Sequence, residues 1–209
     1  VKQCVEDRLL KSVLGLASQE AGKALARALV GKTAIDEDVF TRLIDEKRTL
    51  VEGSTMLEFC HLEEGVKDVG GLDNLKDWLS KRAAAFSPRA KAQGLPNPRG
   101  VLLLGVQGCG KRLTARAAAR LLSFPLLRLD VANLLSADRG ASEKNLRDVL
   151  HLVTMMAPVV LWLDEIEKGF AGMSESQQDT TIIRLVGTFL TWMAEQKAPV
   201  FVVATANSI

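Results

Sequence analysis

Four short apolar runs, separated by helix-like sequence, constrain the fold of this chain more than any other feature. The runs occupy residues 100–105, 125–131, 159–165 and 200–207. The stretches between them include KRLTARAAARLL and ASEKNLRDVLHLVTMM, which have the spacing of amphipathic helices. Continuous apolar strands joined by helices are typical of a parallel sheet that helices cover on both faces. The sequence therefore predicts an α/β fold, in which ligands bind beyond the carboxyl ends of the strands.

Residues 1 to about 60 have a helical pattern instead. One helix is expected to start at Ser18 as its N-cap and to end near Gly31, and a second to follow Asp36 as its N-cap. Their apolar faces hold Ala21, Leu25, Ala28 and Leu29 in the first helix and Val39, Leu43, Leu50 and Val51 in the second. This pattern predicts a small helical bundle over residues 1–62, packed on an α/β domain over residues 63–209. A dedicated partner-binding module is the alternative.

Composition and charge exclude several classes of protein. The 209 residues include 27 Lys and Arg against 25 Asp and Glu, so charge gives no support for binding to nucleic acid or to an anionic membrane. The longest uncharged apolar run, residues 155–163, is too short to cross a bilayer. Three scattered cysteines and two isolated histidines predict neither a disulfide framework nor a zinc site. Without an initiator Met or a signal peptide, the chain is expected to be a piece of a longer protein.

The segment GVLLLGVQGCGKRL predicts a phosphate-binding loop. Four residues separate Gly105 from Gly110, and Lys111 follows, between an apolar strand and a helix. In such a loop, backbone N–H groups and the helix N-terminus bind phosphate oxygens, and the lysine reaches the β- and γ-phosphates. A tight turn without a ligand is the alternative, and the flanking strand and helix favour phosphate. The candidate nucleotide-binding residues are Gly105, Val106, Gln107, Gly108, Cys109, Gly110, Lys111, Arg112 and Leu113.

Polar residues also end two later strands. Asp164 and Glu165 follow VVLWL. In P-loop enzymes an Asp at this point holds Mg²⁺, and the next carboxylate can polarise the attacking water as a general base. Asn207, at the end of VFVVATAN, can orient that water or contact the γ-phosphate. Taken alone, the carboxylates fit a solvated helix start and Asn207 fits a turn. Together with the phosphate loop, they predict Glu165 and Asn207 as catalytic residues and Asp164 as a metal ligand.

In this order, DVGGLDNLKDWL, GLPNPRGVLLLGVQGCGK, VVLWLDEIEK and VFVVATAN resemble the core of AAA+ ATPases. Within that family, GVQGxGK, LWLDEIEKGFAG and GTFLTWMAEQKAPVFVVATAN are similar to an uncharacterised AAA protein of cyanobacteria and plastids. The resemblance implies ATP or ADP and Mg²⁺ as cofactors, with Val69 and Gly70 against the adenine. It also implies self-association into a ring, an unknown protein partner to be remodelled, and a location in the cytoplasm or the plastid stroma.

The chain departs from the family pattern at three points. Arg112 stands where the family has Ser or Thr, and a guanidinium repels Mg²⁺ instead of coordinating it. The chain ends at Ile209, before the family's arginine finger and C-terminal lid. Asp138 and Arg139, before Gly140, stand where unfoldases of the family carry an aromatic and a hydrophobic residue. We therefore expect nucleotide binding to survive, hydrolysis to suffer and polypeptide threading to be absent.

Two functions stay open at this point. The first is an ATPase that remodels a protein partner with impaired hydrolysis, and Asp164, Glu165 and Asn207 favour it. The second is a nucleotide-responsive scaffold without turnover, which Arg112 and the missing aromatic residue favour. A role in handling DNA is disfavoured by the charge balance. We expect an ATP-binding domain of ATPase ancestry.

Overall fold

The computed structural model describes Leu9 and residues 18–32, 34–52, 54–60, 62, 70–136, 139–167 and 175–207. The predicted positions Val69 and Asp138 lie outside these residues, and the side chain of Arg139 is not described either. The elements are α2 (Ser18–Ala28), α3 (Glu37–Glu52), β1 (Leu57–Cys60), α4 (Asp73–Ala83), the 3-10 turn η2 (Ala84–Phe86), α5 (Pro88–Ala92), β2 (Gly100–Leu104), α6 (Lys111–Leu122), β3 (Leu126–Leu129), α7 (Val131–Ser136), α8 (Arg139–Met155), β4 (Val159–Leu163), α9 (Glu175–Glu195) and β5 (Val200–Ala206).

The strands form one sheet in the order β1-β3-β4-β5-β2. Strands β2, β3, β4 and β5 are parallel, and β1 pairs antiparallel with β3. The four parallel strands are the four apolar runs of the sequence, so the predicted α/β fold is confirmed. Every residue of β4 is buried, as a central strand with helices on both faces requires.

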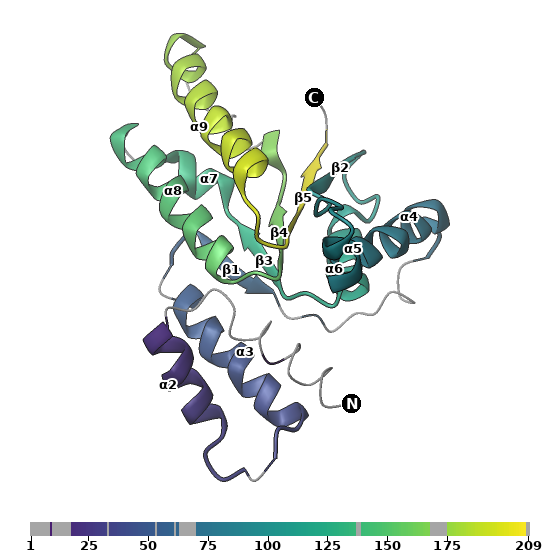
Figure 1. Ribbon diagram of the computed structural model, residues 1–209. Coiled ribbons are helices and arrows are strands. Elements are labelled where there is room, and N and C mark those ends of the chain that lie inside the picture. Colours follow the sequence, from purple (N-terminus) through teal and green to yellow (C-terminus); the bar gives the residue numbers. More distant parts are fainter. Residues whose placement is uncertain are drawn as a thin grey trace.

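Helices cover the two faces of the sheet, with α8 and α9 on one side and α4 and α6 on the other (Figure 1). Alternate residues of β4 serve the two layers, because successive side chains of a strand point to opposite faces. Val159 and Leu161 pack in the α8–α9 layer, whereas Val160 and Trp162 pack in the α4–α6 layer. Each face of the sheet therefore has its own hydrophobic core.

The two N-terminal helices, α2 and α3, pack through a small core of Ala24, Ala28, Val39 and Leu43. Asp36 caps α3 as predicted, because its Oδ1 accepts a hydrogen bond from the Val39 N–H at 3.1 Å. Val51, near the end of α3, belongs to the core of the sheet together with Leu57. The helical pair is therefore joined to the α/β part by shared burial.

Strand β1 corrects the sequence analysis. The expectation of helix up to about residue 60 is wrong for Leu57–Cys60, which pair with Leu126–Leu129. Four residues are too few for a periodic signal, and pairing with β3 decides their conformation. This strand lies on the N-terminal side of the boundary predicted at residue 62; the boundary itself stays a prediction.

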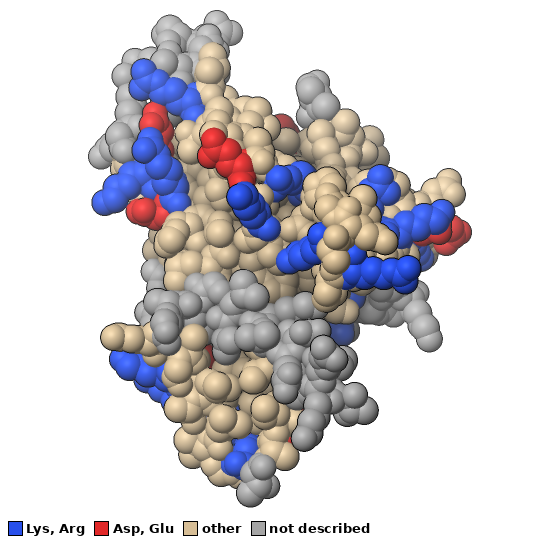
Figure 2. All heavy atoms as spheres, in the orientation of Figure 1, with Lys and Arg blue, Asp and Glu red and all other residues tan. Residues whose placement is uncertain are grey.

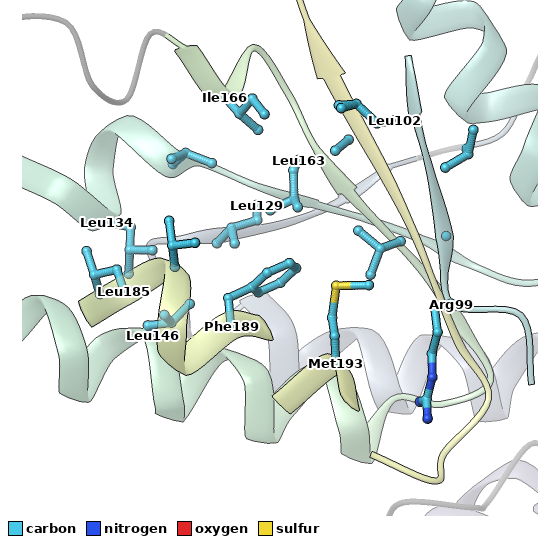
Figure 3. A pocket seen from close by; sticks show the side chains of 16 residues that line it. Arg99, Leu102, Leu129, Leu134, Leu146, Leu163, Ile166, Leu185, Phe189 and Met193 are labelled. Atoms are coloured by element: carbon cyan, nitrogen blue, oxygen red, sulfur yellow. The ribbon is translucent and has the colours of Figure 1, made fainter. Parts of the chain in front are cut away.

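The surface of the described residues carries charge and apolar regions in different places. On the face in Figure 2, Lys and Arg side chains lie in separate groups, with acidic and uncharged residues between them. A cavity of about 450 Å³ between the sheet and α9 is lined almost entirely by apolar side chains, including Leu102, Phe189 and Met193 (Figure 3). None of the helices in the described ranges combines the length and apolar character needed to cross a bilayer.

Candidate nucleotide-binding site

The loop between β2 and α6 has a backbone that glycine permits. Gly108 and Gly110 have φ of +83° and +88°, which side chains of L-residues rarely allow. Gly110 precedes the first turn of α6, and no side-chain hydrogen bond caps this end of the helix. The first N–H groups of α6 and the positive end of its dipole are therefore available to an anion. A phosphate group fits that environment.

Lys111 is held by the loop that it follows. Its Nζ donates to the carbonyl oxygens of Gly105 at 2.6 Å and Val106 at 2.8 Å, and to Asn207 Oδ1 at 2.8 Å. These three acceptors match the three hydrogens of the ammonium group. All three are uncharged, so a phosphate oxygen would bind the ammonium more strongly than any of them.

Asn207 lies between Lys111 and a carboxylate that the sequence analysis did not single out, Glu167. The Asn207 backbone N–H donates to Glu167 Oε1 at 3.1 Å, and its Nδ2 donates to the same oxygen. With Oδ1 facing an ammonium and Nδ2 facing a carboxylate, only one orientation of the amide satisfies both partners. Glu167 therefore fixes which end of Asn207 faces the loop.

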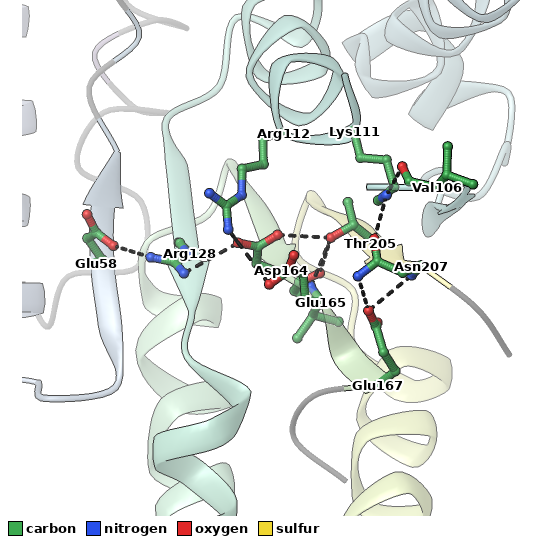
Figure 4. A network of polar contacts seen from close by, with 11 residues as sticks. Glu58, Val106, Lys111, Arg112, Arg128, Asp164, Glu165, Glu167, Thr205 and Asn207 are labelled. Carbon is green, nitrogen blue, oxygen red and sulfur yellow. Dashed lines mark hydrogen bonds and ion pairs between the residues drawn. The ribbon is translucent and has the colours of Figure 1, made fainter. Parts of the chain in front are cut away.

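Asp164 is bound by two guanidinium groups (Figure 4). Its Oδ2 lies 3.1 Å from Arg112 Nη2 and 3.3 Å from Arg128 Nη2, and its side chain is only 4% exposed. Arg128 also contacts Glu58 Oε2 at 3.0 Å, across the β1–β3 pair. Burial alone would lower the pKa of Arg128, but the carboxylates of Glu58 and Asp164 raise it overall. Two guanidinium groups therefore share one carboxylate oxygen.

Glu165 has a left-handed backbone, with φ of +49°, which is uncommon for a residue with a side chain. Its N–H donates to Thr205 Oγ1 at 3.0 Å. The same hydroxyl lies 3.1 Å from Asp164 Oδ1, so Thr205 links both carboxylate residues to β5. Glu165 Oε2 is 3.8 Å from Arg112 Nη2. A backbone outlier held by a buried hydroxyl is the kind of strain that functional sites retain.

Most of the predicted site residues meet around one cavity of about 370 Å³. It is lined by Gln107, Gly108, Gly110, Lys111, Arg112, Leu113, Asp164, Glu165 and Asn207. Gly105, Val106 and Cys109 contact Lys111 from the loop and are not among the lining residues. Gly70 is exposed and does not line the cavity, and Val69 lies outside the described residues.

Four residues of this network were missed in the sequence. Arg128 is a lone charge within an apolar run, which is a usable signal, and Thr205 stands two residues before Asn207 in a buried strand. Glu167 comes two residues after the carboxylate pair, and its position in the sequence indicates only a turn residue. Glu58 gives no signal, because its role depends on the register of β1 against β3.

Nucleotide and Mg²⁺ fit this site unequally. The cavity, the glycine backbone, Lys111 and the uncapped start of α6 suit a phosphate chain. A magnesium ion needs oxygen ligands. Position 112 supplies a guanidinium instead of a hydroxyl, and two guanidinium groups already lie within ion-pair distance of Asp164 Oδ2, although neither of them donates a hydrogen bond to it, while Oδ1 contacts Thr205. Among the described residues, no cluster of three His, Cys, Asp or Glu offers another metal site. The residues present therefore do not fit Mg²⁺.

A glycine-rich loop between a parallel strand and a helix, facing a carboxylate pair that follows another parallel strand one place further into the sheet, defines the P-loop class of nucleotide-binding domains. Within that class, the model for the ATPase family associated with various cellular activities (AAA) matches residues 101–209. The chain belongs to this family. Residues 2–54 match a second model, the second domain of SpoVK-like AAA ATPases.

Relatives in other organisms agree. The chain is 41% identical over 203 residues to the uncharacterised AAA domain-containing protein ycf46 of Pyropia yezoensis, a match that covers 97% of this chain and 41% of that protein. A cell division cycle protein 48 homologue of Archaeoglobus fulgidus is 30% identical over 167 residues, which cover 74% of this chain and 22% of that protein. The predicted resemblance is confirmed, and the chain spans about 41% of the length of its ycf46 relative.

Among solved structures, the AAA domain of FIGL-1 in complex with ADP aligns with a TM-score of 0.54 and 22% identity. The alignment covers 78% of this chain and 55% of that one. At this identity the likeness concerns the fold alone.

Proposed function

We propose that this chain is the ATP- or ADP-binding domain of an AAA ATPase that remodels a protein partner, and that Arg112 impairs its hydrolysis. The observation that carries the proposal is the 3.1 Å ion pair between Arg112 and Asp164. It places the cationic group of a side chain where the family uses a hydroxyl and a metal ion. The same guanidinium lies 3.8 Å from Glu165, the candidate general base. An arginine in contact with both carboxylates supports nucleotide binding with slow turnover.

The phosphates and the adenine each have candidate contacts. The loop N–H groups and Lys111 would bind the phosphates. Arg112, with its side chain 63% exposed, can turn towards phosphate oxygens and supply part of the charge of a metal ion. Asn207 faces the same cavity and would contact the γ-phosphate or the attacking water. Val69 and Gly70 against the adenine stay a proposal from the family resemblance.

Assembly, partner and location are proposed on family grounds. Ring formation and a protein partner are supported by membership of the AAA family and by the likeness to a cell division cycle protein 48 homologue. The match of residues 2–54 to a second domain of AAA ATPases supports counting α2 and α3 as part of this architecture. The net charge of +2 favours a protein partner over nucleic acid. We place the protein in the cytoplasm or the plastid stroma.

A nucleotide-responsive scaffold is the second candidate. The observation in its favour is that Asp164 has partners at both oxygens within the chain itself. Binding without turnover still biases conformation, because a ligand shifts a protein towards the state that it binds better. The two candidates differ in one measurable quantity, the turnover of ATP in a protein of the relatives' full length.

The first experiment is a titration of the chain with a fluorescent ATP analogue. Lys111→Ala should weaken binding by about tenfold or more, because a charge-assisted contact to phosphate contributes about 1.5–3 kcal/mol. Lys81→Ala is the matched control, since Lys81 forms an exposed ion pair with Asp77 on α4. If wild type does not bind at millimolar ligand, or if the Lys111 variant binds equally, the proposal is wrong.

A further inference from the structure

Two guanidinium groups meet at Asp164 Oδ2, and they are held very differently. Arg112 stands at the first turn of α6, its side chain is 63% exposed, and its ion pairs are with Asp164 and Glu165. Arg128 stands on the central part of the sheet, on β3, and its side chain is 36% exposed. The two arginines therefore face the same oxygen with unequal freedom to leave it.

Three contacts fix Arg128 in place. Glu58 Oε2 on β1 lies 3.0 Å from Nη1, and Asp164 Oδ2 on β4 lies 3.3 Å from Nη2. The guanidinium also lies 5.6 Å from the centroid of the Trp162 ring, within the range of a cation–π interaction. Arg128 thus spans three strands of the sheet, from β1 to β4: it donates a hydrogen bond to Glu58 and lies within ion-pair distance of Asp164.

The remaining oxygen of Asp164 is also engaged. Oδ1 lies 3.1 Å from Thr205 Oγ1, a hydroxyl that is fully buried. A magnesium ion at Asp164 would have to displace Arg128 or Thr205 and lose part of its own strongly held water shell. Displacing Arg128 would leave a guanidinium partly buried with one carboxylate partner fewer, which costs free energy.

We propose that Arg128 is a positioning residue that keeps Asp164 neutralised when Arg112 turns to a bound phosphate, so that this site takes its nucleotide as the metal-free polyphosphate anion. The inference rests on the nucleotide binding proposed above. In this proposal the two arginines have different roles. Arg112 supplies positive charge to the phosphates. Arg128 prevents Asp164 from becoming an unpaired buried carboxylate or a metal ligand. Exchange of Arg112 for the family's hydroxyl residue is then not enough to restore a magnesium site.

The test compares binding of a fluorescent ATP analogue in excess Mg²⁺ and in EDTA, and uses the ratio of the two dissociation constants. Wild type and Arg112→Thr should both give a ratio of about one to three. The double variant Arg112→Thr, Arg128→Gln should give a ratio of about ten or more, the effect of one charge-assisted contact. Arg147→Gln is the control, because Arg147 forms its ion pair with Glu143 on α8.

Two results would overturn the inference. In one, Arg112→Thr alone reaches the ratio of the double variant. In the other, the double variant binds nucleotide with a ratio of about one. If the double variant does not fold by circular dichroism, Arg112→Thr, Arg128→Met takes its place, with Arg112→Thr, Arg128→Lys as its charge-keeping control: the first should raise the ratio and the second should not. An equal ratio in both would contradict the role of Arg128.

The proposed nucleotide binding and the proposed role of Arg128 can be disproved independently of each other. If wild type binds no nucleotide, the proposed function is wrong, and thermal unfolding with Mg²⁺ alone still tests Arg128. A bound ion stabilises the folded state, so Mg²⁺ should raise the melting temperature of the double variant and not that of Arg112→Thr. A rise in both, or in neither, would count against Arg128 as the residue that excludes the ion.

Discussion

Lys111 and Arg112 are neighbours in the sequence, but they organise two different halves of the cavity. The Lys111 half consists of carbonyl oxygens of the loop and the amide of Asn207, with Glu167 behind that amide. The Arg112 half consists of the carboxylates of Asp164 and Glu165, with Arg128 behind Asp164. Figure 4 shows the two side chains diverging from the start of α6.

The two cations differ in the contacts that each of them loses when it binds a phosphate. Lys111 leaves uncharged acceptors, which are weaker partners for an ammonium group than a phosphate oxygen is. Arg112 leaves carboxylates, which compete with the phosphate for its charge. The Lys111 half is therefore prepared for an anion, whereas the Arg112 half is already neutralised by its own side chains. Three further experiments test this difference between the two halves of the cavity.

The largest effect is expected at Glu165, in the Arg112 half. In a protein of the relatives' full length, Glu165→Gln should lower ATP turnover by about 10²–10⁴-fold, the usual contribution of a general base, and leave nucleotide affinity nearly unchanged. The measurement is steady-state phosphate release, with Glu143→Gln on α8 as control. An unchanged rate would remove Glu165 as the base, and a wild type without turnover would favour the scaffold.

A smaller effect, about a hundredfold, is expected for cysteine labelling in the Lys111 half. Cys109 is exposed and lies 3.9 Å from Lys111 Nζ. Burial raises the pKa of the Cys60 thiol to about 11, which disfavours the reactive thiolate at lower pH. At pH 8 iodoacetamide should modify Cys109 at least about a hundred times faster than Cys60, because Cys109 is exposed whereas burial lowers the thiolate fraction of Cys60 about a hundredfold from that of an ordinary thiol.

The same labelling reaction, carried out in the presence of ATP, tests whether the nucleotide binds at the loop that contains Cys109. Mass spectrometry should show that ATP protects Cys109 and leaves the slow reaction of Cys60 unchanged. Protection of both thiols would point to a change of overall stability. Labelling of Cys109 that ATP does not slow would place the nucleotide away from the loop.

The smallest effect is expected at Glu167, behind Asn207. Glu167→Ala removes the acceptor of two Asn207 hydrogen bonds, so the amide loses its fixed orientation towards Lys111. ATP affinity should fall by about five- to tenfold, the effect of about one ordinary hydrogen bond. Glu167→Gln keeps a carbonyl acceptor and should lose less. Equal affinities in wild type, Ala and Gln variants would show that Asn207 needs no support.

The strands and the loop were predictable because each is a local pattern. The apolar runs of β2 to β5 and the spacing from Gly105 to Lys111 are read without knowing the rest of the fold. The partners of Asp164 were not predictable in this way, because Arg128 and Thr205 reach it across neighbouring strands and depend on their register. Glu58 was the hardest to foresee, since β1 is short and antiparallel and forms only by pairing with β3.

Strand β1 also bears on how this domain is best produced for study. A protein expressed from residue 63 onward would keep the whole match to the AAA family, residues 101–209, and would lack Leu57–Cys60. The edge of β3 would then present unpaired backbone groups, a known cause of association between chains. Arg128 would lose Glu58 at the same time. Solubility screens and metal titrations on such a shortened protein would report on an altered sheet, so useful boundaries begin before residue 57.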